Sequence, residues 1–221
     1  GACLQPCRRA YQVKDKEKDI ELEVDNEYIM SPKDLKTVHF LNKILDAGVK
    51  VLKIEGRGRS PEYVKKVTQV YREAVNAWFR GDYTRENISK WEEELKSVYN
   101  RGFWDGYYLG QRLGEWTEKY GSQATRKKIY VGKVTNYFSK IGVIELKVQT
   151  NDLEVGDNFM IIGSTTGVYE DSVKELRVNL EPVQKSVKGD ECSFPVSKPI
   201  RRGDKVYKVI HVEQKKIDFQ A

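Results

Sequence analysis

Hydrophobic positions in the first 80 residues follow two periods, one typical of strands and one typical of helices. Residues 10–30 alternate apolar and polar side chains about a charged bend, which predicts a hairpin with one wet face. Residues 32–47 and 61–80 carry apolar residues at helical spacing, and a Ser-Pro pair opens each segment. Ser31 and Asp34 have the spacing of a capping box, so we expect the first helix to begin at Pro32.

Between the two predicted helices, the run VKVLKIEG at residues 49–56 predicts a short buried strand. A helix–strand–helix order implies parallel strands with crossover helices, as in a (β/α) barrel or an open α/β sheet. Only one or two parallel strands can be counted, far fewer than a closed sheet needs. We therefore expect residues 1–80 to be the C-terminal part of a larger α/β domain.

The pattern changes after a third predicted helix, which begins at Thr84. Residues 115–128 show no periodicity, as is typical of a linker, so residues 81–128 are interpreted as helix plus linker. Short apolar runs separated by Gly, Asn and Asp follow, with no helix to cover them. They predict a small closed β-barrel over residues 129–212, and residues 213–221 form a tail.

Gly-Asp pairs recur inside the predicted barrel at residues 156–157, 189–190 and 203–204, where they indicate turns between strands. The VGD turn is similar to turns in the second domain of translation elongation factors, and the predicted barrel resembles that domain. The expected fold class is therefore multidomain α+β: a C-terminal remnant of a (β/α) TIM-like barrel, followed by a small all-β barrel.

Composition narrows the possible partners and location. The chain has 221 residues and a formal net charge of +6, which is compatible with a polyanionic partner. No apolar run reaches the length that spans a bilayer, and the N-terminus has no signal-peptide pattern, so no membrane association is expected. Three cysteines do not make a disulfide framework, which favours a cytoplasmic location.

The predicted strand at residues 49–56 carries charged side chains near its C-terminal end. Strand alternation places Lys53 and Glu55 on the face opposite Leu52 and Ile54. In a (β/α) barrel Lys53 and Glu55 would point into the upper layer, where such enzymes bind and transform substrates. Burial of both charges implies a Lys53–Glu55 pair or a bound ligand, and a salt-bridged strand end is the structural alternative.

Basic residues recur in two places where anions could bind. Arg57 and Arg59 lie in the glycine-containing loop before the second helix, well placed for phosphate or carboxylate. Arg8 and Arg9 follow two cysteines and would lower a thiolate pKa, although a solvated turn explains them equally well.

Cys3 and Cys7 form a C-x3-C pair, which differs from the C-x2-C spacing of zinc knuckles and supplies only two ligands. A metal or cluster role and a structural role both stay open for this pair. Cys192 lies in a predicted strand and is expected to pack in a core. Neither His39 nor His211 has a serine-protease or zinc-protease motif around it, so both are interpreted as ordinary structural histidines.

Several blocks together resemble a known family. GACLQPCRRAY, EYIMSPKDL and VKVLKIEGRGRSPEYVKKVTQVYREAV are similar to signature blocks of the U32 peptidases, the collagenase-like proteins. The subgroup that they most resemble contains the prephenate-dependent tRNA uridine hydroxylases. The resemblance implies an N-terminal (β/α) barrel, a small β domain and a 4Fe–4S cluster held by four cysteines. Cys3 and Cys7 match the last cysteine pair, so we expect the chain to be the C-terminal portion of a longer protein whose preceding cysteines lie before Gly1.

The resemblance leads to three functional hypotheses. The first is an iron–sulfur tRNA wobble-uridine hydroxylase that uses prephenate as co-substrate and tRNA or another RNA as partner. The second is a collagenase-like peptidase, as the family name implies, and the third is an RNA- or partner-binding module. The fragment alone is expected to be inactive, and a second copy could cover its incomplete sheet. In the first hypothesis the cluster ligands are Cys3 and Cys7, the anion-binding residues are Arg8, Arg9, Arg57 and Arg59, and the pocket-lining residues are Lys53 and Glu55.

Overall fold

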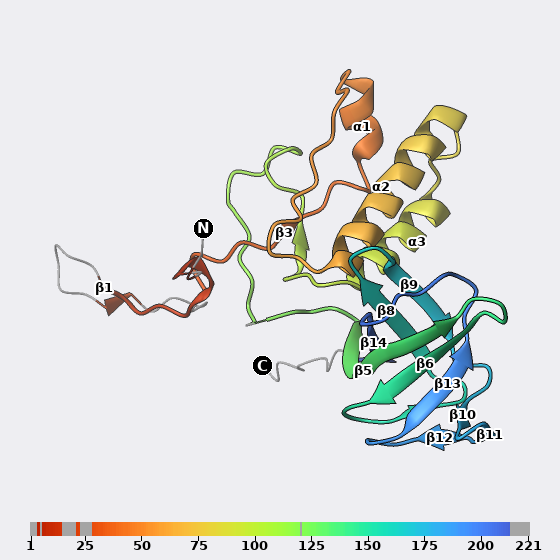
Figure 1. The fold of residues 1–221 in the computed structure, drawn as a ribbon. Helices are drawn as coiled ribbons and strands as arrows, with labels where there is room; N and C mark the ends of the chain where they lie inside the picture. The colour runs from red at the N-terminus through yellow and green to blue at the C-terminus, as the bar shows by residue number, and fades with distance from the viewer. Residues whose placement is uncertain (1–3, 5, 15–20, 23–27, 120, 213–221) are drawn as a thin grey trace. The chain divides into compact units, whose positions relative to one another are not determined.

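A computed structural model describes residues 4, 6–14, 21–22, 28–119 and 121–212 (Figure 1). The chain divides into two compact units, one formed by residues 1–57 with 66–124 and the other by residues 58–65 with 125–221. We call the first the helical unit and the second the β unit, and each is described by itself.

The helical unit combines three helices with short pieces of strand. Its ladders are an antiparallel pair, β1 with β2, inside the predicted hairpin, and a parallel pair, β3 with β4. Helix α2 begins among the residues grouped with the β unit and continues into the helical unit. The elements are η1 (Pro6–Arg8), β1 (Val13–Lys14), β2 (Glu21–Leu22), β3 (Asp34–Leu35), α1 (Leu41–Asp46), α2 (Pro61–Arg80), α3 (Arg85–Lys96) and β4 (Phe103–Trp104).

Two of the predicted helices are confirmed. Helix α2 starts at the proline of the second Ser-Pro pair and buries one side, formed by Val67, Val70, Ala74 and Ala77. Helix α3 is capped by Thr84, whose hydroxyl accepts a hydrogen bond from the Asn87 backbone N–H at 3.3 Å. Trp91 and Leu95 are the buried residues of α3.

The predicted helix over residues 32–47 is wrong in its first half. Only Leu41–Asp46 is helical, and Asp34 belongs to the parallel ladder with β4. The Ser31 hydroxyl accepts a hydrogen bond from Arg8 Nη1 at 2.9 Å, while the Asp34 carboxylate binds the Arg101 guanidinium at 2.8 Å. Both side chains therefore bind distant partners in place of the helix amides that a capping box would serve.

The predicted strand over residues 49–56 is also wrong as a strand, although its alternation is present. Leu52 and Ile54 are half-buried, whereas Val51 is 82% exposed. A strand requires a hydrogen-bonding neighbour, and no described strand pairs with this segment. In the described part of the helical unit, the parallel strand pairing expected of an α/β domain is therefore found between β3 and β4.

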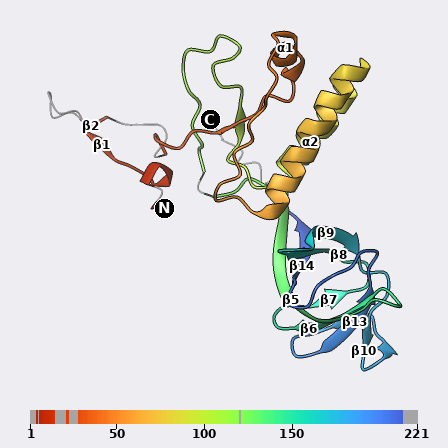
Figure 2. The same cartoon turned by 45° about the horizontal axis from the view of Figure 1, so that its top comes forward.

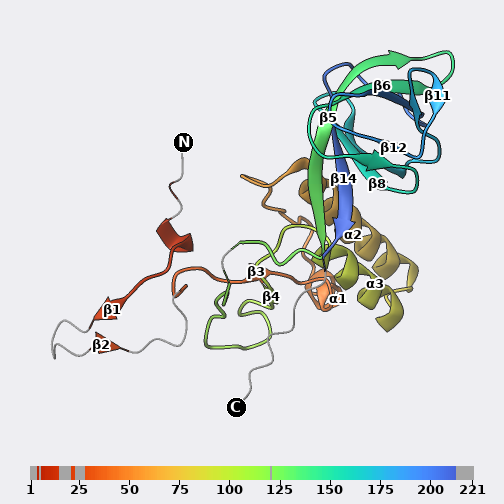
Figure 3. The same cartoon turned by 90° about the horizontal axis from the view of Figure 1, so that it is seen from below.

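The β unit is built on one eight-stranded sheet, in the order β11-β10-β13-β6-β5-β14-β8-β9. Every strand pairing in this sheet is antiparallel, and the long strands β5 and β14 run side by side (Figures 2 and 3). The strands are β5 (Arg126–Phe138), β6 (Val143–Val148), β7 (Leu153–Glu154), β8 (Asn158–Gly163), β9 (Gly167–Ser172), β10 (Arg177–Val178), β11 (Glu181–Pro182), β12 (Lys185–Ser186), β13 (Glu191–Pro195) and β14 (Lys205–His211).

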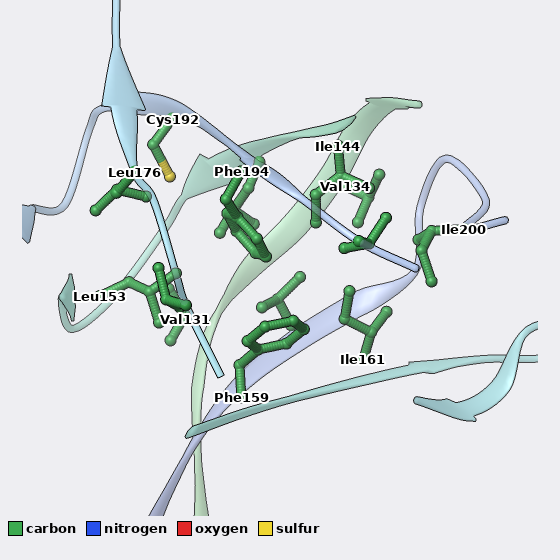
Figure 4. Packing of buried hydrophobic residues seen from close by; sticks show 14 of the residues in the cluster. Val131, Val134, Ile144, Leu153, Phe159, Ile161, Leu176, Cys192, Phe194 and Ile200 are labelled. Carbon is green, nitrogen blue, oxygen red and sulfur yellow. The ribbon is translucent and has the colours of Figure 1, made fainter. Parts of the chain in front are cut away.

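The sheet rolls around one hydrophobic core, to which strands from β5 to β14 contribute (Figure 4). The rings of Phe159 and Phe194 meet edge to face at the centre, with centroids 5.0 Å apart. Cys192 lies in the same cluster and is 0% exposed, so its predicted packing role is confirmed.

The hydrogen-bond ladder of this sheet does not run all the way round in the part of the chain that is described. Its edges are β9 and β11, and β7 pairs with β12 in a separate two-stranded ladder. Two backbone hydrogen bonds, from Gly156 N–H to the Val173 carbonyl and from Val173 N–H to the Asp157 carbonyl, connect the end of β9 to the segment after β7. The expected all-β domain is therefore present as a rolled sheet with a separate β7–β12 ladder, whose strands precede β9 and follow β11 in sequence.

Candidate functional site

A groove in the helical unit lies beside the segment that carries most of the predicted pocket residues. It encloses about 350 Å³ between α2 and the chain that follows α1. Leu52 and Ile54 face it, as the predicted alternation requires. The other main apolar side chains of the groove are Leu45, Val49, Tyr71, Val75, Trp78 and Phe79.

Lys53 and Glu55 lie on the opposite face of this segment from the groove, and both side chains are exposed. Glu55 Oε1 accepts a hydrogen bond from the Arg57 backbone N–H at 2.5 Å, which closes a local turn. The described contacts include no Lys53–Glu55 ion pair, and the alternative, a ligand bound by these side chains, stays a prediction. The charged face is therefore open to solvent in this conformation.

The two predicted loop arginines are separated by the division of the chain. Arg57 is exposed in the helical unit, whereas Arg59 belongs to the β unit. The Arg59 guanidinium carbon lies 4.9 Å from the centroid of the Tyr63 ring, a cation–π distance. The structure therefore gives Arg59 a stacking partner and leaves the Arg57 side chain on the surface.

The N-terminal cysteine segment is described at Cys7 but not at Cys3, which lies outside the described residues. Cys7 sits in the single turn η1 and is half-buried. Arg8 ties this turn to the buried Ser31 hydroxyl, and Arg9 is exposed. No group of three or more His, Cys, Asp or Glu side chains that could hold a metal lies within the described ranges. Cys7 can therefore supply one ligand, and further ligands must come from elsewhere.

A charged cluster around His39 was not predicted from the sequence. His39 Nε2 lies 3.0 Å from Asp105 Oδ1, and Nδ1 lies 3.8 Å from Glu92 Oε1. Lys36 also binds Glu92 and lies 5.4 Å from the centroid of the Phe103 ring. The sequence could not predict this cluster, because Glu92 and Asp105 are more than fifty residues from His39 and have no motif around them.

The cluster holds an imidazole between two carboxylates. A carboxylate beside one nitrogen fixes the orientation of the imidazole ring, as a proton-transfer site requires. The Nδ1 atom is buried and makes no hydrogen bond in the structure. Among the described residues, no hydroxyl or thiol forms a hydrogen bond with either nitrogen of His39. The cluster therefore offers an oriented imidazole but no adjacent nucleophile in this part of the chain.

In the β unit, titratable groups serve the fold. Burial raises the pKa of the Cys192 thiol to about 11, which keeps it in the unreactive protonated form. Glu62 pairs with Lys128 at 2.6 Å. Burial acts to raise the pKa of Glu62, but hydrogen bonds from Lys128 and Ser60 outweigh it and leave the pKa below its ordinary value.

Comparison with sequence models of protein families shows which family the chain belongs to. The sequence model described as peptidase family U32 matches residues 1–118, more than half of the chain. The chain belongs to peptidase family U32. All the predicted site residues lie inside this match, as do His39 and Asp105, whereas the strands from β5 onward lie outside it.

U32 relatives carry two kinds of name. A Porphyromonas gingivalis protein named collagenase is 56% identical over 208 residues, which cover 94% of this chain and 50% of the relative. A Bacillus subtilis tRNA hydroxylation protein is 30% identical over 217 residues, covering 92% of this chain and 51% of the relative. An Escherichia coli 23S rRNA 5-hydroxycytidine synthase is 34% identical over 122 residues, covering 52% and 18%. The chain spans about half the length of the first two relatives.

Solved structures give weaker likenesses. The C-terminal domain of a Geobacillus thermoleovorans U32 peptidase aligns with a TM-score of 0.34 at 14% identity, covering 36% of this chain and 90% of that domain. The bacterial selenocysteine-specific elongation factor EF-Sec aligns with a TM-score of 0.30 at 12% identity, covering 64% and 23%. TM-scores of this size carry no functional argument. In the U32 chain itself, no described helix is long and apolar enough to cross a membrane.

Proposed function

We propose that the chain is part of an RNA hydroxylase with a tRNA wobble uridine as substrate, an iron–sulfur cluster as cofactor and prephenate as co-substrate. The observation that carries the proposal is the setting of Cys7, a half-buried thiol beside two arginines on an anchored turn. Relatives named as tRNA hydroxylation protein and 23S rRNA 5-hydroxycytidine synthase support an RNA substrate.

Cys7 fits the role of a cluster ligand better than Cys192 does. Iron–sulfur clusters are held by cysteine thiolates, usually four, and their potential depends on nearby charge and solvent exposure. Cys7 is accessible and lies next to Arg8 and Arg9, whose charges favour an anionic cluster, whereas Cys192 is sealed in the core. The cluster would supply electron-transfer chemistry, and Cys3 with Cys7 would provide half of its protein ligands.

The remaining predicted residues have defined places in this proposal. Arg57 and Lys53 are exposed basic side chains that can bind the carboxylates of prephenate. Residues 49–56 would become a strand of a (β/α) barrel once a neighbouring strand, from the rest of the protein or from a second copy, pairs with them. This pairing would turn the exposed Lys53 and Glu55 toward the barrel interior, and a cytoplasmic location belongs to the same proposal.

The test uses the full-length gene in its own host. Deletion should remove hydroxyuridine from total tRNA, measured by nucleoside mass spectrometry, and wild-type protein should restore it. Cys7→Ala should fail to restore it, while the control Cys192→Ala should restore it at matched protein level. An unchanged nucleoside profile after deletion would overturn the proposal.

A peptidase is the second candidate, and two observations favour it. The chain is 56% identical to a protein named collagenase, and His39 Nε2 lies 3.0 Å from Asp105 Oδ1. If purified full-length protein cleaves denatured collagen, loss of cleavage in His39→Ala and Glu55→Ala with retention in Cys7→Ala would establish this reading. Cleavage that neither substitution reduces would exclude these residues as its source.

A further inference from the structure

The three central strands of the β unit place lysines directly opposite one another. In the register of the sheet, Lys147 on β6 faces Lys133 on β5, and Lys133 faces Lys205 on β14. We call these three residues the lysine row. Neighbouring residues Val134, Leu146 and Val206 are buried, so the row lies on the solvent face of the sheet. Like charges directly opposite across a ladder destabilise the pairing, so the row has a cost in the free protein.

Protein carboxylates do not neutralise most of this charge. Lys147 lies 3.6 Å from Glu191 and donates to the Gly189 carbonyl at 2.8 Å. Lys133 and Lys205 are exposed, and neither makes an ion pair within the described part of the chain. Lys133 and Lys205 therefore carry positive charge that no described carboxylate compensates.

Other lysines of the same unit do have acidic partners. Lys208, three residues after Lys205, binds Asp157 at 2.8 Å and Asp152 at 3.1 Å. Lys128, five residues before Lys133, binds Glu62 at 2.6 Å. The same two strands thus carry paired lysines, Lys128 and Lys208, and unpaired ones. Of the unpaired lysines, Lys133 and Lys205 lie directly opposite each other in the row, whereas Lys127 lies outside it.

A tight turn adds two arginines beside the row. The Asp204 backbone N–H donates to the Arg201 carbonyl at 3.1 Å, and Gly203 has a φ of 89°, as a type II turn requires. Gly203 N–H also donates to the Val134 carbonyl at 2.8 Å, which places the turn next to Lys133 on β5. Arg201 and Arg202 are both exposed and without a carboxylate partner among the described residues.

The turn is held rigidly from beneath by Asp204. Its buried carboxylate accepts hydrogen bonds from the Thr166 hydroxyl and from the Arg201 backbone N–H at 2.9 Å. Gly163 makes room for it, because a Cβ there would lie 1.8 Å from Asp204 Oδ1. The basic residues are therefore presented on a fixed scaffold, so little backbone ordering is needed when a ligand binds.

We propose that the lysine row, together with Arg201 and Arg202, binds consecutive phosphates of an RNA backbone. Adjacent strands lie about 4.8 Å apart, so the row presents three ammonium groups along a line of roughly 10 Å. Phosphate contacts by Lys and Arg dominate nucleic-acid affinity, whereas lysine is depleted from protein–protein interfaces. The choice of RNA over other nucleic acids rests on the proposed hydroxylase function.

The test is tRNA binding by the whole chain, measured by filter binding over a series of salt concentrations. The variant is Lys133→Gln with Lys205→Gln. The charge-matched control is Lys140→Gln with Lys174→Gln, two exposed lysines of the β unit outside the row. The variant should lose affinity by roughly tenfold at moderate salt, and its log–log salt slope should fall by about two, one for each lost phosphate contact.

Thermal unfolding separates binding from folding. Because the variant relieves repulsion between opposite lysines, its melting temperature should equal or exceed that of the wild type. If affinity and salt slope stay at the control's values, or if the wild-type chain shows no salt-dependent tRNA binding, the proposal is overturned. Displacement of tRNA by polyglutamate at equal charge concentration would also overturn it, in favour of an acidic protein.

The two experiments can separate failure of the RNA-binding surface from failure of the proposed hydroxylase function. Absence of hydroxyuridine loss in the deletion strain, combined with variant-sensitive tRNA binding, would reject the hydroxylase and retain the RNA surface. Intact hydroxylation dependent on Cys7, combined with variant-insensitive binding, would reject the surface and retain the enzyme.

Discussion

Segments with alternating apolar and polar residues occur in both the β unit and the helical unit, but they form different structures. In the β unit, alternating strands are locked in register by neighbours, and their inward side chains meet in one core. In the helical unit, the alternating segment at residues 49–56 has apolar side chains on one face but no described hydrogen-bonded neighbour. Alternation thus selects which side chains turn inward, while a strand needs a second chain to pair with.

The consequence is a difference in how each unit should respond to mutation. Phe159 is 1% exposed at the centre of the β core, whereas Phe79 at the groove of the helical unit is 74% exposed. A core that is filled on all sides loses stability when a ring is removed. A groove open to solvent loses little.

The largest expected effect is therefore at Phe159. Phe159→Ala should lower the free energy of unfolding of the β unit by about 3–5 kcal/mol, because it removes a packed ring and leaves a cavity. Phe79→Ala should change stability by no more than about 0.5 kcal/mol. Urea unfolding followed by circular dichroism measures both. Equal losses would mean that the groove is covered in solution.

The next effect concerns the helical unit alone. Thr84→Ala removes the cap of α3 and should cost about 1 kcal/mol, since the Asn87 backbone N–H loses its hydrogen-bond acceptor. Ser89→Ala, on the exposed side of the same helix, is the control and should be nearly neutral. Helical ellipticity during urea unfolding reports both. An equal loss of stability in Thr84→Ala and Ser89→Ala would contradict the role of the cap.

The smallest effect is a pH dependence in the β unit. Hydrogen bonds from Lys185 and Lys208 hold the pKa of Asp152 below its ordinary value of 3.8. A depressed carboxyl pKa contributes stability that is complete above the unfolded pKa and is lost as pH falls through the folded pKa. The melting temperature should therefore decrease below about pH 4.

The control for this pH dependence is Asp152→Asn, which removes the titrating group and keeps the side-chain size. Its melting temperature should be slightly lower at neutral pH and should fall less steeply in acid than that of the wild type. Parallel acid profiles for the two proteins would contradict a role for Asp152.

Local signals predicted the elements whose starting residue or alternation is contained in the segment itself. Helices α2 and α3 begin where Pro61 and Thr84 indicate, and the run of short strands forms the β unit. The helix over residues 32–47 was mispredicted because Ser31 and Asp34 bind Arg8 and Arg101. A capping signal carries no information about such distant competitors.

The candidate site was predictable only in part, for the same reason. Alternation correctly placed Leu52 and Ile54 on the face opposite Lys53 and Glu55, but it could not reveal that the two charged residues do not pair with each other. The contact between His39 and Asp105 depends on how the chain returns after α3. The lysine row likewise depends on strand register, which neither charge content nor periodicity determines.

Cys192 gives the β unit an internal reporter of its own opening. Its thiol has no exposed surface and its pKa is raised to about 11, so a thiol reagent can reach and modify it only in molecules that have opened. The rate of modification under native conditions then measures the free energy of that opening, residue-specifically and without denaturant. Half-buried Cys7 would react without this opening. The same chain therefore contains one thiol that is modified quickly and one whose modification is limited by opening of the β unit.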